Sequence, residues 1–108
     1  GGKKYATGSS ETNASSLIVI SGLDFSPGIV ITEDIDYTAY DGDCWGIFVK
    51  GGQNVSAVSA GRINPELTPG FVPGAYDRSS STIWASNGFT VYPGVGSGHT
   101  IKWMAFEE

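Results

Sequence analysis

The sequence predicts an all-β protein, an antiparallel β-sandwich of about six to eight short strands. Short runs of β-branched and aromatic residues alternate with turn formers, and the 108 residues include 16 Gly and 5 Pro. No window keeps a helical period over about ten residues. This length suits a single domain, for which we expect residues 17–108, with residues 1–16 as a linker or an edge segment.

The segments that match a strand pattern are 17–21, 28–32, 44–51, 54–60, 81–86, 89–92 and 99–106. The first two, LIVIS and GIVIT, are so apolar that they predict strands buried on both faces or nearly so. The sequence KGGQ at 50–53 predicts a hairpin, and Asn87 with Gly88 predicts a tight turn. The glycine-rich loop at 94–98 predicts another hairpin, which would join 89–92 to 99–106.

Alternation with a period of two assigns the side chains of the last strand to two faces. One face holds Ile101, Trp103 and Ala105, and the other holds Thr100, Lys102, Met104 and Phe106. We expect Phe89 and Val91 to form a core layer with Trp103, which we therefore interpret as structural.

Composition excludes several classes of function. The net charge is -5, with only six Lys and Arg, so a nucleic-acid partner is not expected. The single cysteine, Cys44, excludes an intrachain disulfide and a thiolate zinc cage, and it reads as a small buried hydrophobe. No stretch reaches the ~18 apolar residues of a membrane span, and the start of the chain lacks the apolar region of a signal peptide, so membrane insertion is not expected.

The glycine-rich loop at 94–98 does not match a known catalytic or phosphate-binding motif. Phosphate loops require other glycine spacings and a following helix, whereas a strand is expected here. Ser97 lacks the spacing of a nucleophile elbow, and His99, the only histidine, has no obvious nucleophile beside it. No cofactor is expected.

The acidic segments EDID and YDGD leave three readings open. We favour a solvated acidic loop with an Asp-Gly turn. The alternative is a calcium site built from oxygen ligands, although the spacing of a calcium loop is absent. Such a cluster would comprise Asp34, Asp36, Asp41 and Asp43. A third reading is a glycan hydrolase that uses Asp34 with Asp41 or Asp43 as its paired carboxylates.

Aromatic residues beside acids give the better indication of a binding surface. The proline-rich stretch 62–81 has no sustained period and predicts a long surface loop. Sugars suit such surfaces because their apolar face stacks on an aromatic ring while their hydroxyls bind carboxylates and amides. Outward aromatics serve equally well in a subunit interface. The candidate ligand-binding residues are Tyr37, Tyr40, Asp41, Asp43, Tyr76, Asp77, Arg78 and Trp84.

Two segments carry a resemblance to a known family: SLIVISGLDFSPGIVI at 16–31 and NGFTVYPGVGSGHTIKWMAF at 87–106. The chain resembles the C-terminal domains of phage tail-fibre and receptor-binding proteins, which are similar to H-type lectins. The matching residues are Phe25, Pro27, Ile29–Ile31, Gly88–Val91, Trp103 and Ala105. They keep the fold, and residues 33–81 do not follow the pattern, so no sugar-binding residue is carried over.

The resemblance implies a trimeric, H-type-lectin-like sandwich in a virion, outside the cell. It further implies a non-enzymatic attachment domain, whose partners would be other virion proteins and a host-surface glycan bound through loops 33–43 and 62–81. The alternative is a structural domain that trimerises or decorates a virion fibre without binding a ligand.

Overall fold

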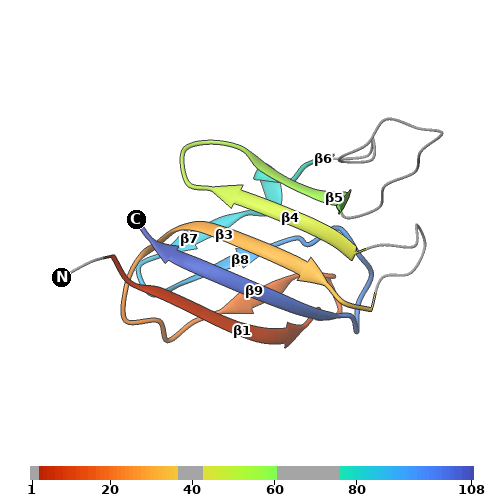
Figure 1. Cartoon of the computed structure of the whole chain (residues 1–108), viewed down its shortest axis with the longest axis horizontal. Helices are drawn as coiled ribbons and strands as arrows, with labels where there is room; N and C mark the ends of the chain where they lie inside the picture. The colour runs from red at the N-terminus through yellow and green to blue at the C-terminus, as the bar shows by residue number, and fades with distance from the viewer. Residues whose placement is uncertain (1–2, 37–42, 61–75) are drawn as a thin grey trace.

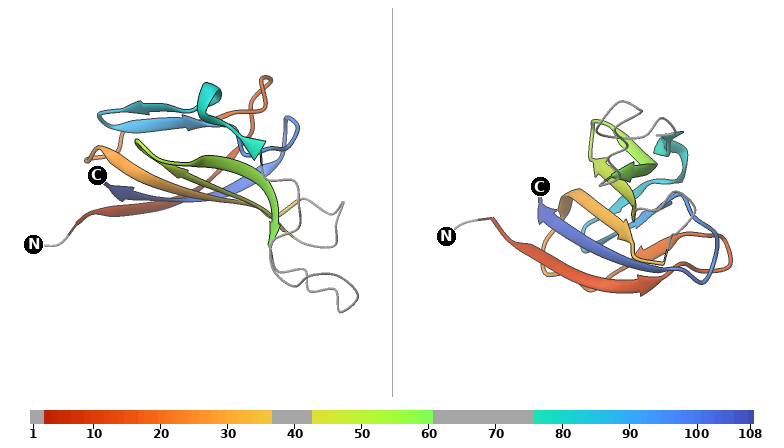
Figure 2. Two further views of the ribbon diagram at one scale, coloured as in Figure 1. Left: turned by 90° about the horizontal axis from the view of Figure 1, so that it is seen from above. Right: turned by 45° about the vertical axis from the view of Figure 1, so that its right-hand side comes forward.

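The structure, a computed structural model, describes residues 3–36, 43–60 and 76–108, and it shows two antiparallel sheets packed face to face (Figure 1). The larger sheet has the strand order β1-β9-β3-β4-β5-β6 and the smaller sheet the order β2-β8-β7. The two layers are separated most clearly when the molecule is seen from above (Figure 2). The predicted antiparallel sandwich is therefore confirmed.

The strands of the larger sheet are β1 (Tyr5–Glu11), β3 (Pro27–Asp34), β4 (Asp43–Val49), β5 (Asn54–Ala60), β6 (Tyr76–Asp77) and β9 (Thr100–Glu107). Those of the smaller sheet are β2 (Ile18–Ile20), β7 (Ile83–Ala85) and β8 (Gly88–Val91). The helical content of the described residues is a single 3-10 turn, Ser79–Ser81.

The core lies between the two sheets. Phe89 of β8 meets Trp103 of β9 edge to face, with ring centroids 5.5 Å apart, and Val91 is completely buried beside them. This confirms the predicted core layer and the faces assigned to β9. Cys44 is 3% exposed and packs in the same core, as expected of a small hydrophobe.

The predicted hairpin between 89–92 and 99–106 is wrong. Strand β8 pairs with β2 and β7, whereas β9 pairs with β1 and β3, so the intervening segment crosses from one sheet to the other. Within this segment, Pro93 and Val95 are buried against the core. Alternation in the sequence identified the inward faces correctly, but it carries no information on which strand is the hydrogen-bonded partner.

Burial of the first two strands on both faces is also wrong. Strand β3 alternates between buried and partly exposed residues, and Ile29 is 40% exposed. On β2, Val19 is 59% exposed. Among the described residues no third layer covers either sheet, so each strand has one face toward solvent even where its residues are apolar.

The two tight connections predicted from glycine are confirmed. Strands β4 and β5 form a hairpin whose turn includes Gly51 at a φ of 77°, a conformation that favours glycine. Strands β7 and β8 form a hairpin in which Ala85 pairs with Gly88. A Cβ on Gly88 would lie 2.0 Å from the carbonyl oxygen of Ile20, so the close approach of β2 to β8 requires glycine there.

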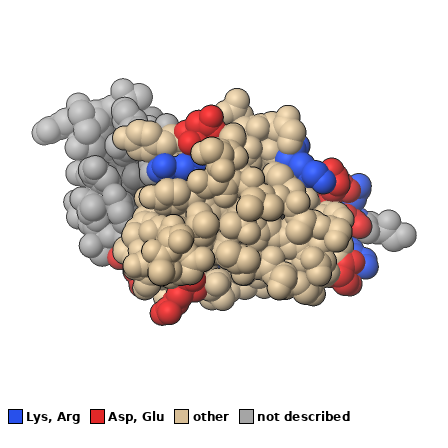
Figure 3. Space-filling view, turned by 180° about the vertical axis from the view of Figure 1, so that it is seen from behind, with Lys and Arg blue, Asp and Glu red and all other residues tan. Residues whose placement is uncertain are grey.

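Both termini lie at the same end of the sandwich (Figure 1). Salt bridges cluster there, with Lys4 Nζ 3.2 Å from Asp24 Oδ2 and Lys50 Nζ 3.1 Å from Glu108 Oε1. The view from behind shows charged side chains at this end and at the margins, while the middle of the described surface has none (Figure 3). At the opposite end lie the last residue of β3, the first of β4 and the last of β5. Among the described residues no helix is long or apolar enough to cross a membrane.

Candidate functional site

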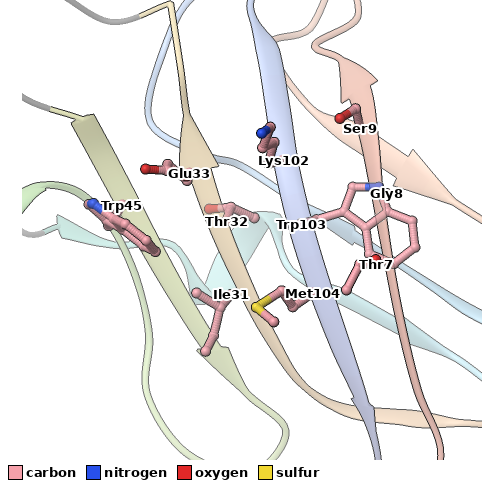
Figure 4. Close-up of a pocket in the computed structure, with 10 residues that line it drawn as sticks. All are labelled: Thr7, Gly8, Ser9, Ile31, Thr32, Glu33, Trp45, Lys102, Trp103 and Met104. Atoms are coloured by element: carbon pink, nitrogen blue, oxygen red, sulfur yellow. The ribbon is translucent and has the colours of Figure 1, made fainter.

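The outer face of the larger sheet carries a groove of about 390 Å³ across strands β1, β9, β3 and β4 (Figure 4). Outward side chains form its walls, and the strand backbones form its floor. The lining residues are Thr7, Gly8, Ser9, Ile31, Thr32, Glu33, Trp45, Lys102, Trp103 and Met104. This volume lies within the range of small-molecule sites, which is roughly 300–1,000 Å³.

The strand register arranges the outward side chains in cross-strand rows. Glu33 pairs with Trp45 on one side and with Lys102 on the other, and Lys102 pairs with Ser9. Directly opposed residues in antiparallel strands have Cβ atoms about 5 Å apart, so these four residues are neighbours along the row. We call this row, Trp45–Glu33–Lys102–Ser9, the polar row.

The neighbouring row is mostly apolar. Ile31 pairs with Ile47 and with Met104, and Met104 pairs with Thr7. Ile47 is 40% exposed and Met104 is 42% exposed, which is high for apolar side chains of central strands. We call this row, Ile47–Ile31–Met104–Thr7, the apolar row. The groove therefore combines an indole, an apolar strip and a line of charged and hydroxyl groups.

A second cluster joins the β6 edge of the larger sheet to the smaller sheet. The Arg78 guanidinium carbon lies 4.5 Å from the ring centroid of Tyr92 and 5.1 Å from that of Tyr76. Its Nε donates a hydrogen bond of 3.0 Å to Ser56 Oγ, and this hydroxyl donates one of 2.7 Å to the Tyr92 carbonyl. Because Ser56 is fully buried and Tyr92 follows β8, Arg78 links the two layers.

Asp77 stabilises the turn that follows this cluster. Its Oδ1 accepts hydrogen bonds from the Ser79 hydroxyl at 2.6 Å and from the Ser79 amide at 3.0 Å. These bonds hold the pKa of the fully exposed Asp77 carboxyl below its ordinary value of 3.8, the hydroxyl contributing most. One carboxylate oxygen of Asp77 is thus used within the turn.

A third cluster pairs the only histidine with a buried carboxylate. Asp34 Oδ2 lies 2.8 Å from His99 Nδ1, and Asp34 Oδ1 accepts a hydrogen bond from the Asp36 amide. The Asp34 side chain is completely buried, so the predicted solvated acidic loop is wrong at this position. The loop prediction was wrong here because Asp34 is the last residue of β3 and its side chain faces inward. Its partner His99 is 65 residues away in the sequence, and no local pattern reveals a contact over that separation.

The chemistry of this pair is limited by its neighbours. Within the described part of the chain, the His99 ring is hydrogen-bonded to the Asp34 carboxylate, a contact that fixes the orientation of the imidazole. Within residues 3–36, 43–60 and 76–108, no group of three or more His, Cys, Asp and Glu side chains is placed to hold a metal ion. Thr12 Oγ1 instead accepts from the His99 amide and donates to the Gly96 carbonyl, which ties this end of the sandwich together.

The sequence-predicted ligand residues are only partly brought together. Tyr76, Asp77 and Arg78 lie together at the β6 edge, whereas Trp84 lies on β7 and packs against the core. Tyr37, Tyr40 and Asp41 lie outside the described residues. Asp43 is the first residue of β4, and its side chain lies outside the described part of the chain.

Sequence reasoning missed the groove residues Glu33, Trp45 and Lys102. Alternation placed Lys102 and Met104 on the outward face of β9, and the same argument applied to β3 and β4 would have placed Glu33 and Trp45 outward. Only the register shows that they form one row. Comparison of the chain with protein-family profiles, curated proteins and solved structures finds no match.

Proposed function

We propose that this chain is a non-enzymatic carbohydrate-binding domain of a phage or prophage virion appendage, and that it attaches the virion to a host-surface glycan. The observation that supports the binding function best is the groove on the outer sheet face, in which Glu33 lies between Trp45 on one side and Lys102 on the other. The appendage context comes from the resemblance of residues 16–31 and 87–106 to phage receptor-binding domains.

The groove has the mixed chemistry that sugars require. A pyranose ring has an apolar face, which stacks on an indole such as that of Trp45, and equatorial hydroxyls, which need donors and acceptors close by. The polar row supplies an ammonium at Lys102 and a hydroxyl at Ser9, and the apolar row ends in the hydroxyl of Thr7. Because the groove crosses strands on a sheet face, it suits a glycan chain lying across the sheet.

The arrangement of the ends fits attachment. Both termini lie at one end of the sandwich, and the ends of β3 and β5 point the other way. A domain tethered through either terminus would present the opposite end and the length of the sheet face to a target surface. The predicted loop residues Tyr76 and Arg78 remain a second place where a glycan could bind, and the test below separates the two.

The test measures binding to an array of bacterial surface polysaccharides and to purified Gram-positive cell walls, with unaltered protein and two variants. We expect binding to weaken about tenfold in Trp45→Ala, since loss of a stacking contact costs about 1.4 kcal/mol. Tyr76→Ala, which removes an exposed ring 58% accessible to solvent at the β6 edge, is the matched control and should bind normally.

The outcomes are distinct. Loss of binding in Tyr76→Ala alone would move the site to the predicted loops and overturn the groove. Absence of binding by unaltered protein to every probe would count against the carbohydrate function itself. Glycan cleavage, detected as new reducing ends, would contradict the non-enzymatic assignment and return attention to Asp34 and the acidic segment.

A second candidate function is structural: the domain would trimerise or decorate a virion fibre without a ligand. It is favoured by the exposed apolar side chains of the outer sheet face, where Ile29, Ile47 and Met104 are each at least 40% exposed. Mass measurement in solution tests it. A stable trimer that binds no probe supports this function, and a monomer at high concentration rules it out.

A further inference from the structure

The β1 edge of the larger sheet is long and unprotected. Strand β1 covers Tyr5–Glu11, and among residues 3–36, 43–60 and 76–108 its only strand partner is β9, on one side. It contains no proline, its pairing with β9 shows no bulge, and Glu11 is its only charged residue. Natural edge strands are usually blunted by such devices or kept short, because a free edge accepts another strand.

The other described edges follow that rule. Strand β6, at the far edge of the larger sheet, comprises two of the described residues, and β2 and β7, at the edges of the smaller sheet, have three each. The seven residues of β1 are the exception. An unblunted edge of this length is able to accept another strand, and the question is which strand would pair with it.

The hydrogen bonds show which groups of β1 point outward. The amide of Glu107 donates to the carbonyl of Lys4, and the amide of Thr12 donates to the carbonyl of His99, each at 2.9 Å. Both contacts continue the β1–β9 register, so even-numbered residues bond to β9. The odd-numbered residues therefore direct their amides and carbonyls to the free edge: Tyr5, Thr7, Ser9 and Glu11.

We propose that this edge pairs with the β1 edge of a second copy of the chain, antiparallel and about a two-fold axis at Gly8. In this register all residues of β1 are paired, and the outward-directed residues face each other. Tyr5 then lies opposite Glu11 of the second copy, and Thr7 opposite Ser9 of the second copy. Each of these pairs exchanges two backbone hydrogen bonds, and Thr opposite Ser is a favourable cross-strand pair.

Two features of β1 suit this register. Gly8, at the axis, has no side chain, and a Cβ there would lie 2.6 Å from Cζ2 of Trp103, so the position stays small. The axis is perpendicular to the sheet, which keeps the outer faces of both copies on the same side. Within the described residues, a ring made through the two edges of the larger sheet would pair β1 with Tyr76–Asp77 of β6, which offers fewer backbone hydrogen bonds than a two-fold contact between two β1 strands.

The pairing would extend the groove, and this part of the inference rests on the proposed glycan function. The groove reaches β1 through Thr7, Gly8 and Ser9. In the dimer, the polar row of one copy continues into the apolar row of the other, because Ser9 faces Thr7 of the second copy. Seven strand spacings of about 4.8 Å separate the two β4 strands, so the two Trp45 side chains would stand roughly 34 Å apart. The ligand class is then an extended polysaccharide that spans both copies.

Amide hydrogen exchange of the unaltered protein tests the pairing without any glycan. Free-edge amides exchange only while a copy is unpaired, so at a concentration where about nine-tenths of chains are dimeric their exchange should slow about tenfold. We expect this slowing at Thr7 and Ser9, measured by NMR at low and high concentration alongside sedimentation analysis. The amides of Ala6 and Ser10, which face β9, are internal controls and should not change.

A variant provides a second measurement. Ser9→Pro removes an outward amide donor that has no partner in the described part of one copy, so this variant should keep the fold and shift the protein to monomer. The exchange pattern of the unaltered protein decides the question even if this variant folds poorly. A monomer at every concentration would overturn the proposal, and so would a dimer or trimer in which Thr7 and Ser9 exchange rapidly. If the dimer forms and no polysaccharide binds, the pairing stands and the proposed function fails.

Discussion

Replacing Arg78 with alanine should destabilise the fold, because this side chain links the two sheets. The substitution removes contacts to the rings of Tyr92 and Tyr76 and a hydrogen bond to the buried Ser56 hydroxyl. The backbone amide of Arg78, which donates to the Asn54 carbonyl at 2.6 Å, is unaffected. The loss is therefore confined to the guanidinium group.

The magnitude follows from the exposure of each contact. Tyr92 is partly buried and Tyr76 is 58% exposed, so we assign about 1 kcal/mol to the first stacking contact and about 0.5 kcal/mol to the second. The hydrogen bond adds about 1 kcal/mol. The sum, about 2.5 kcal/mol, corresponds to a decrease in Tm of about 10 °C for a domain of this size. Arg78→Lys keeps the charge but loses the planar stacking group, so it should lose about half as much.

Thermal and urea unfolding monitored by circular dichroism measure this loss. Lys102→Ala is the matched control, since it removes a cation that is exposed on β9, and its free energy of unfolding should stay within about 0.5 kcal/mol of the unaltered protein. If Arg78→Ala melts with the unaltered protein and instead loses glycan binding, the structural role is refuted and the sequence-based assignment of Arg78 to a ligand site is supported.

Three further predictions test other features of the fold. Gly8→Ala should lower the free energy of unfolding by about 1–3 kcal/mol, because the new Cβ would lie 2.6 Å from a Trp103 ring that is itself packed against Phe89, whereas Gly96→Ala, with nothing within 4 Å, should be neutral in the same urea titration. Thr32→Val should raise the free energy of unfolding by about 1 kcal/mol, since the buried Thr32 hydroxyl has no hydrogen-bond partner and valine has the same shape; a decrease in Tm would show that the hydroxyl is satisfied. The lowered pKa of Asp77 means that its carboxylate stabilises the fold above its unfolded pKa and that this stability is lost as pH falls through the lower folded value, so Tm measured between about pH 5 and pH 2 should fall less in Asp77→Asn than in the unaltered protein, and parallel curves would contradict the assignment.

The sequence was most informative about features that depend on single positions, namely which side chains of a strand are buried and where a tight turn occurs. Alternation placed Ile101, Trp103 and Ala105 in the core, and glycine identified the turns after Val49 and before Gly88. Such signals are local, because they depend on the period of one strand or on the conformation of one turn. They sufficed for the class of fold and for most of the buried side chains.

Long-range pairing was not accessible in the same way. The residues 89–92 and 99–106 look like hairpin strands because a short glycine-rich loop lies between them, yet a loop of that length also allows the chain to cross to the other sheet. The polar row could not be predicted from the sequence for the same reason. Trp45, Glu33 and Lys102 become neighbours only when three strands are in register. Register depends on the summed packing of both faces, which no single motif contains.

The unequal widths of the two sheets connect the Arg78 cluster, the tight packing at Gly8 and the free β1 edge. Six strands face three, so at about 4.8 Å per strand the smaller sheet leaves roughly half of the larger sheet uncovered on the inner side. Side chains fill the two flanks instead: Arg78 with its tyrosines at the β6 side, and the Trp103 ring over Gly8 at the β1 side. Gly8 leaves room for the Trp103 ring on the inner face of β1, and the free edge of the same strand is where the proposed second β1 strand pairs. Gly8→Ala therefore tests the inner face of β1, and Ser9→Pro tests its free edge. Together, the two variants should separate the stability of the single copy from its assembly.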